Sequence, residues 1–149
     1  MVAINLSKAF DCIGHNLLLA KLKAYGLRDT ALKLLRSFLH ERKQRVICNN
    51  SCSNWTPICC GVPQGSLLSP LLFNIFMNDM NEAVNDSSLR LYADDTTQYM
   101  ADKNPTVLQF LLNQDMERLS SWLDHNYLQA NRDKTQANWS LAKVPTTMT

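Results

Sequence analysis

Long hydrophobic runs and a large excess of one charge are both missing from this 149-residue sequence. The apolar runs are broken by Asn, Gln or charged residues and fall well short of the roughly 20 residues of a membrane span. Residues 1–10 lack the pattern of a secretory signal. With 46% hydrophobic, 19% charged and 8% aromatic residues, the composition excludes a disordered, collagen-like or coiled-coil chain. It predicts one globular domain, or part of one, that is soluble and intracellular, in the nucleus or the cytoplasm.

Cysteines are too unevenly placed for a disulfide framework. There are five, an odd number, and two of them are adjacent, which favours free structural thiols. A zinc-stabilised interaction module is the alternative, because four of them follow the spacing C-x3-C-x6-C-C. No His lies between them and the paired C-x2-C spacing of zinc knuckles is missing, so free thiols are the preferred interpretation. The five are Cys12, Cys48, Cys52, Cys59 and Cys60.

The net charge of +2 hides an uneven distribution. Residues 1–50 contain nine basic and three acidic side chains, whereas residues 51–149 contain six and ten. A basic half next to an acidic half favours a surface for a polyanion beside a site for cations, although solvated helix faces often show similar unevenness. A non-catalytic nucleic-acid-binding module is therefore one hypothesis. Charge reversal at Arg42, Lys43 and Arg45 would test it.

Strand and helix patterns interleave along the chain without repeats or linkers, which predicts an α+β domain. A strand over residues 2–6 starts so early that a missing neighbouring strand is implied. Residues 136–149 lose all periodicity, so we expect a divergent, disordered tail after a domain of residues 1–135. The other expected elements are helices over 16–25, 29–39 (capped by Asp29 or Thr30), 70–84 (capped by Ser69) and 105–126, hairpins over 44–60 and 89–99, a loop over 61–66, and a strand and turn over 128–134.

Two adjacent acids, Asp94 and Asp95, fall at the expected tip of the second hairpin. Neighbouring carboxylates repel each other unless a positive charge lies close to them. Oxygen ligands of this kind favour Mg²⁺, which typically takes one or two carboxylates and keeps several waters. A solvated turn is the alternative, because Asp is a common turn residue.

Four short blocks follow one another along the chain. They are Leu6-Ser7-Lys8-Ala9-Phe10-Asp11, Gly61-Val62-Pro63-Gln64-Gly65-Ser66 and its continuation to Asn74, Tyr92-Ala93-Asp94-Asp95, and Trp122-Leu123 with Asn126, Leu128, Asn131, Lys134 and Thr135. The third block resembles the Y-x-D-D catalytic hairpin of reverse transcriptases, and the other three resemble blocks of the same enzymes in the order of the family and at compatible spacings. Their sequences resemble the non-LTR, LINE-type retrotransposons more than retroviruses, group II introns or telomerase.

The resemblance implies a polymerase palm, in which an antiparallel sheet with the catalytic hairpin packs on helices, within a truncated right-hand polymerase. It implies an RNA-directed DNA polymerase that joins dNTPs to a DNA primer on an RNA template, with two Mg²⁺ ions bound by Asp94 and Asp95. Phe10 would lie under the sugar of the incoming nucleotide and exclude a 2′-hydroxyl by collision. Lys134 would neutralise charge or donate a proton as pyrophosphate leaves. The other residues expected to bind nucleotide or template are Ala9, Gln64, Gly65, Ser66 and Tyr92.

Several of these roles have a structural alternative. Phe10 could belong to the core, Gln64 could stabilise its own loop, and Lys134 could be solvated like most lysines. Trp122 lies on the apolar stripe of its helix and is assigned to the core rather than to base stacking.

The chain departs from the family pattern in two respects. Asn5 stands where the first block of the family has an Asp that supplies a third metal-binding carboxylate. An amide oxygen can coordinate Mg²⁺ but adds no negative charge. Asp11 lies beyond the strand and is expected to cap the following turn rather than replace that ligand. Sequence resembling fingers and thumb is also missing, so we expect a catalytically impaired domain fragment.

Overall fold

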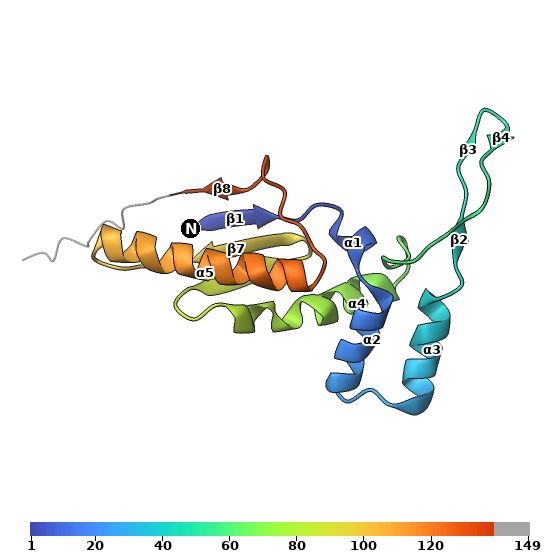
Figure 1. Cartoon of the computed structure of the whole chain (residues 1–149), viewed down its shortest axis with the longest axis horizontal. Coiled ribbons are helices and arrows are strands. Elements are labelled where there is room, and N and C mark those ends of the chain that lie inside the picture. The colour runs from blue at the N-terminus through green and yellow to red at the C-terminus, as the bar shows by residue number, and fades with distance from the viewer. Residues whose placement is uncertain (139–149) are drawn as a thin grey trace, which may run out of the picture.

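The computed structural model describes residues 1–138, and its centre is a four-stranded antiparallel sheet in the order β6-β7-β1-β8 (Figure 1). β1 (Val2–Asn5) lies between β7 (Asp95–Tyr99) and β8 (Gln136–Ala137), and β6 (Ser88–Tyr92) pairs with the far edge of β7. The predicted α+β fold, with an antiparallel sheet packed on helices, is confirmed.

β8 corrects two expectations drawn from the sequence. It pairs Val2 with Ala137 and Ala3 with Gln136, so the second edge of β1 is covered and the implied missing neighbour is not needed there. The expected disorder is wrong for residues 136 and 137, while residues 139–149 lie outside the described part. Two residues carry too little periodicity to be recognised as a strand without their partner.

Alternation along the strands gives the sheet an inner and an outer face. Ile4, Thr96 and Gln98 are buried on the inner face, where the Thr96 hydroxyl lies 4.0 Å from the sulfur of Met80. Asp95 is exposed on the outer face, and so are Tyr92, Arg90 and Ser88 on the same face of β6.

One part of the core lies between the inner face of the sheet and three helical segments, and the same cluster continues to Leu18, Leu22 and Leu39 in the helices described next. The three segments are α4 (Leu68–Met77), the 3-10 segment η1 (Asn78–Ala83) and α5 (Pro105–His125), which starts with the side chain of Asn104 accepting a hydrogen bond from the Thr106 N–H. Trp122 packs against this core, as predicted. The largest fully buried side chains include Ile4, Phe73, Phe76, Met77, Met80 and Leu119.

A second group of helices extends the body beyond the sheet (Figure 1). α1 (Ala9–Cys12) leads into α2 (His15–Ala24), which packs against α4 on one side and α3 (Asp29–Leu39) on the other. The predicted apolar stripe of α3 is only partly used, because Leu39 is buried but Leu34 is 69% exposed. Within residues 1–138 no helix has the length and apolar character needed to cross a membrane.

The helix caps expected from the sequence are wrong at two places. Arg28, not Asp29 or Thr30, occupies the N-cap position of α3, and Leu67 occupies that of α4, both without a side-chain cap. The Ser69 hydroxyl instead donates a hydrogen bond to the carbonyl of Pro63, 2.5 Å away. Ser69 therefore fixes the preceding loop to the helix rather than capping the helix.

The predicted hairpin after α3 is present and projects away from the rest of the chain (Figure 1). β2 (Lys43–Gln44) pairs with β5 (Thr56–Pro57), and further out β3 (Ile47–Cys48) pairs with β4 (Ser51–Cys52). Its tip is a two-residue turn, Asn49-Asn50, in which both residues have positive φ, a conformation that Asn tolerates better than most residues.

Candidate active site at the hairpin of residues 88–99

The two acids predicted to bind metal lie at the turn between β6 and β7. Tyr92 pairs with Asp95 across the hairpin, and Ala93, with φ of 52°, makes the turn together with Asp94. Asp94 is half-buried and Asp95 is exposed. Within residues 1–138 neither forms a salt bridge, so both carboxylates remain available to a cation.

Asn5 lies directly beside this turn. β1 and β7 pair in a register that sets Asn5 opposite Asp95, and the Asn5 amide Nδ2 donates a hydrogen bond to Asp95 Oδ1 at 3.0 Å. A carboxylate at position 5 would instead repel Asp95 in the absence of a cation, since like charges directly opposite each other in a sheet destabilise it. The amide N–H therefore offsets part of the negative charge that a cation would otherwise have to neutralise.

The backbone at Asn5 is anchored by the segment that follows α5. The Asn131 N–H donates to the Asn5 carbonyl at 2.7 Å, and Leu6 forms an isolated bridge with Ala130. Lys134 lies in the turn that follows, where its backbone N–H donates to the Asn131 carbonyl. Its side chain is exposed and makes no hydrogen bond or salt bridge within the described residues, so the structure brings its backbone segment, but not its ammonium group, into contact with the site.

Phe10 stands between the acidic hairpin and the glycine-containing loop of residues 61–66. Its ring stacks on Phe73 with centroids 4.2 Å apart and is half-buried. The exposed part borders one hollow with Tyr92 and a second with Gln64. Phe10 thus contacts the core and also faces both expected binding elements.

The other residues expected to bind nucleotide or template differ in exposure. Tyr92 is 85% exposed, and Gly65 and Ser66 border the hollow beside Phe10. Ala9 is only 3% exposed and lies within the core, so its side chain does not face solvent.

The loop of residues 61–66 is held against α1. The Val62 N–H donates to the Phe10 carbonyl at 2.9 Å, and the Gln64 amide donates to the Asp11 carboxylate at 3.0 Å. Gly61 has φ of 84°, and a Cβ there would lie 2.8 Å from the Asp11 carbonyl oxygen, so only glycine fits. Asp11 therefore binds Gln64 rather than capping the following turn.

A cavity of about 780 Å³ opens between this loop and the root of the projecting hairpin. Two basic residues far apart in the sequence, Lys8 and Arg42, line it together with Asp11 and Gln64. The sequence offers no periodic signal for this cavity, because it forms only where the hairpin joins the body.

The structure assigns an important role to Asp115, which the sequence patterns did not predict. It is completely buried and accepts hydrogen bonds from the backbone N–H groups of Asn85, Asp86 and Ser87, from the Ser87 hydroxyl, and from Arg118. Burial alone would raise the pKa of this carboxyl, but these hydrogen bonds outweigh it and hold the pKa well below its usual range. An acid on the apolar stripe of α5 was the signal that could have found it.

The Asp115 network fixes the segment that enters β6. Ser87 also accepts a hydrogen bond from Gln98, which is completely buried on β7. α5 is thereby connected through Ser87 to both arms of the acidic hairpin.

The zinc interpretation is not supported by the placement of the cysteines. Cys48 and Cys52 lie at the outer end of the projecting hairpin, while the backbone of Cys60 forms an isolated β-bridge with Gly14 at its root. Within residues 1–138 no three Cys, His, Asp or Glu side chains come together as a metal site. All five cysteines are free thiols, as preferred from the sequence.

Comparison with known proteins gives a family match over residues 1–143, to the family described as reverse transcriptase (RNA-dependent DNA polymerase). The chain is 30% identical over 138 residues to the RNA-directed DNA polymerase from mobile element jockey of Drosophila melanogaster, covering 88% of this chain and 15% of that protein. It is 30% identical over 86 residues to the Pol polyprotein from the type-1 retrotransposable element R2 of Popillia japonica, covering 58% of this chain and 14% of that protein.

Among solved structures, telomerase from Candida albicans has the same fold, with a TM-score of 0.69 at 15% identity over 95% of this chain and 27% of that one. The match to the family extends past residue 135, where we expected the domain to end. The chain therefore belongs to the reverse transcriptase family, and its fold and relatives confirm the palm of a non-LTR retrotransposon enzyme.

Proposed function

We propose that this chain forms the nucleotide-joining centre of a LINE-type reverse transcriptase, in which the metal site is weakened at Asn5. In this proposal it binds an RNA template and a DNA primer across the open face of the sheet. The Asn5–Asp95 hydrogen bond of 3.0 Å is the observation that carries the proposal, because it joins the residue expected at the third metal-binding position to one of the two acids expected to bind the metal.

Reverse transcriptases in general depend on divalent metal ions. In this chain Asp94 and Asp95 are the residues that would hold Mg²⁺, which when bound offsets the negative charge of a triphosphate. Their two carboxylates fit an ion that keeps several waters. A site with three carboxylates does not fit this chain, because the third position offers a neutral amide whose N–H already points at Asp95.

The neighbouring residues would position the nucleotide and template. Phe10, supported from behind by Phe73, presents a rigid ring that would collide with a 2′-hydroxyl and so favour dNTPs over rNTPs. Gly65 has open space where a Cβ would stand, which supports close approach of a template backbone. Gln64 is tied to Asp11, so its role beside the new base pair requires that bond to loosen or be shared.

The test is Asn5→Asp in the full chain. Without divalent ions the variant should be less stable by about 1 kcal/mol, because two carboxylates then face each other across β1 and β7. With Mn²⁺ or Mg²⁺ the loss should be reversed, and calorimetry should show at least about tenfold tighter Mn²⁺ binding than in the unchanged chain, since even outer-sphere changes alter metal affinity by ~10–100-fold.

Asn50→Asp is the matched control, because it makes the same chemical change in an exposed turn remote from the acidic pair. It should leave both Mn²⁺ affinity and the metal dependence of stability unchanged. Equal Mn²⁺ affinity of Asn5→Asp and the unchanged chain would refute the proposed site. Vigorous primer extension by the unchanged chain on a primed RNA template would refute the impairment.

A second candidate is a nucleic-acid-binding remnant without catalysis. The amide at position 5 favours it, because a site stabilised without metal can persist after catalysis is lost. It predicts salt-dependent binding of primer–template by both the unchanged chain and Asn5→Asp, with no nucleotide incorporation by either.

A further inference from the structure

Within residues 1–138 nothing packs against the projecting hairpin over most of its length. Every residue from 41 to 57 is exposed, and the strands pair only with each other. Figure 1 shows them extending beyond α3, away from the sheet. Isolated two-stranded hairpins are marginal in water, so such an element is expected to have a function that compensates for its small contribution to the core.

Large apolar side chains are exposed on this hairpin. Val46, Ile47 and Trp55 keep 69%, 64% and 59% of their surface in solvent. Large exposed apolar patches are rare on soluble monomeric proteins and commonly mark interaction sites.

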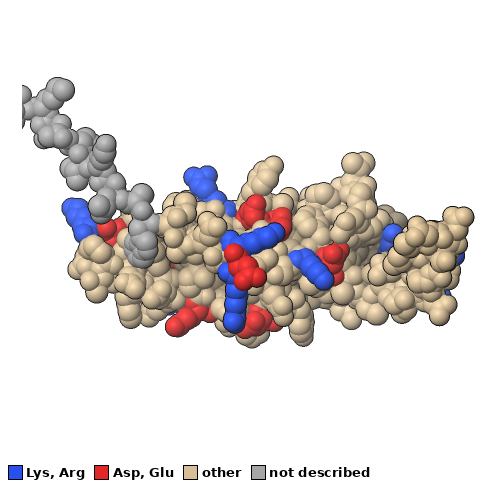
Figure 2. Space-filling view, turned by 90° about the horizontal axis from the view of Figure 1, so that it is seen from above, with Lys and Arg blue, Asp and Glu red and all other residues tan. Residues whose placement is uncertain are grey.

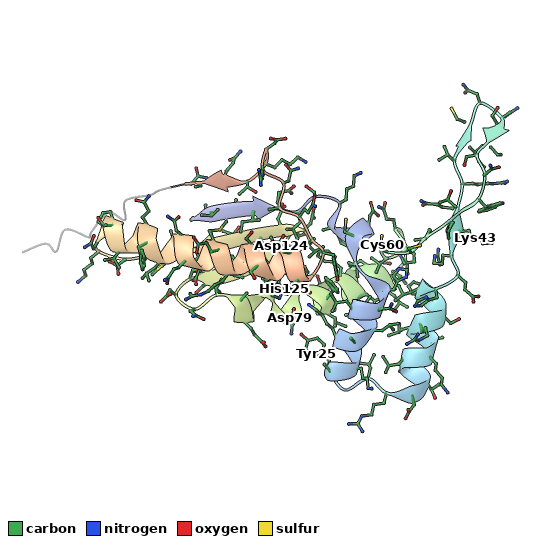
Figure 3. The ribbon with its side chains drawn as sticks, viewed as in Figure 1. Tyr25, Lys43, Cys60, Asp79, Asp124 and His125 are labelled. Carbon is green, nitrogen blue, oxygen red and sulfur yellow. The ribbon has the colours of Figure 1, made fainter. Side chains whose placement is uncertain are left out.

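The charge of the hairpin has one sign. Residues 42–60 contain Arg42, Lys43 and Arg45 and not one acid. Figure 3 shows Lys43 on the hairpin well apart from the labelled acids Asp79 and Asp124, and at the hairpin end of the face in Figure 2 there are blue side chains but no red ones. The complement of this surface is a polyanion.

A bulge in the hairpin brings a cation and an aromatic ring together. Gln44 pairs with Thr56, and Val46 exchanges hydrogen bonds with Ser53, so Arg45 alone faces both Asn54 and Trp55. Bulges of this kind redirect side chains. The Arg45 guanidinium lies 4.8 Å from the centre of the Trp55 ring, which orients the ring while leaving most of it in solvent.

We propose that the hairpin of residues 42–57 binds single-stranded nucleic acid, with a base stacked on Trp55 and phosphates against Arg42, Lys43 and Arg45. Stacking on an exposed aromatic ring between cations needs no base-specific contact and requires an unpaired base, so single strands are favoured over duplex. This inference rests on the proposed function only for the class of polymer, since the hairpin lies apart from Asp94 and Asp95.

The experiment uses the full chain and a fluorescent 20-nucleotide RNA of mixed sequence, alone and annealed to its complement, with binding followed by anisotropy. Trp55→Ala should weaken binding of the single strand about 5- to 150-fold, since stacking of one base contributes roughly 1–3 kcal/mol. Trp55→Phe should restore most of the affinity. Arg45→Ala should reduce the magnitude of the slope of log binding constant against log salt concentration by about 0.7 for the single strand.

Leu34→Ala is the matched control, because Leu34 is exposed to 69% on neighbouring α3 and lies outside the hairpin. Circular dichroism of each variant verifies that the fold is intact. Unchanged RNA affinity of Trp55→Ala, an equal loss for duplex, or no RNA binding by the full chain would each overturn the inference. So would a change in sedimentation of Trp55→Ala without loss of RNA binding, which would identify the surface as a protein contact.

The two proposals fail separately. If Asn5→Asp leaves Mn²⁺ affinity unchanged while Trp55→Ala still weakens single-strand binding, the proposed function alone is rejected. If the metal effect appears and the Trp55 effect does not, the hairpin inference alone is rejected.

Discussion

The helices around the sheet and the hairpin of residues 42–57 contain similar apolar residues but place them differently. Phe73 and Phe76 are completely buried between the helices and the inner face of the sheet, whereas Val46, Ile47 and Trp55 on the hairpin are mostly exposed. Burial of an aromatic side chain stabilises a fold by roughly 1.5–3 kcal/mol relative to exposure, so the body of the molecule should provide nearly all the stability. Apolar groups on the hairpin are therefore free to serve binding.

The largest expected difference between the two regions comes from truncating one aromatic residue in each. Phe76→Ala should lower the free energy of unfolding by about 3–5 kcal/mol, because it leaves a cavity in a closely packed core. Urea titration followed by circular dichroism measures the loss.

Trp55→Ala is the counterpart in the hairpin, and should change the same free energy by less than about 0.5 kcal/mol. A loss at Trp55 as large as that at Phe76 would contradict the division between a stabilising body and a binding hairpin.

The next largest effect is expected at Asp115, a charge inside the stabilising body. Asp115→Asn keeps the shape but removes the charge that accepts four hydrogen bonds from the 85–87 segment and one from Arg118, and should cost about 2–4 kcal/mol at pH 7. Thermal or urea unfolding across a pH series measures it.

The pH dependence of this effect has a definite sign. The folded pKa of Asp115 is depressed, so its stabilising contribution is fully present above the unfolded pKa of about 4 and is lost as the pH falls through the range below it. The difference between the unchanged chain and Asp115→Asn should be constant above about pH 5 and shrink towards acid. A difference that grew towards acid would contradict the assigned hydrogen bonds.

A smaller effect is expected where the hairpin joins the body. Gly61→Ala should be less stable than Gly65→Ala by about 1–3 kcal/mol, because both positions have positive φ but only at Gly61 would the added Cβ collide with the backbone of Asp11. Urea unfolding of the two variants compares them directly. Equal losses would mean that the loop and α1 move apart without cost.

Much of the fold could be predicted from sequence because its main elements are long or strongly patterned. The α5 stripe, flanked by Asn104-Pro105, and the alternation around Leu89 and Leu91 each specify one element. The acidic pair at the turn of the hairpin could be recognised only from four blocks in order, since the pair alone also fits a solvated turn.

The remaining features depend on contacts between distant segments. β8 has two residues and exists because β1 offers it an edge. Leu34 fits an apolar stripe yet nothing packs over it within the described residues, and the orientation of the Asn5 amide depends on the register of β1 with β7. The proposed roles of Ala9, Phe10, Gln64, Ser66, Tyr92 and Lys134 stay predictions.

The order of strands in the sheet has a consequence for the kinetics of folding. The residues that flank β1 in space are far away along the chain, 96 positions in the pair Val2–Gln98 and 135 positions in the pair Val2–Ala137. Closing such long loops costs conformational entropy before the contacts between the strands can stabilise the fold, so chains with this topology fold slowly. On a ribosome β1 would therefore remain unpaired until β7, at least 90 residues further along the chain, had emerged, and a chaperone that shields β1 during this interval should raise the yield of native protein.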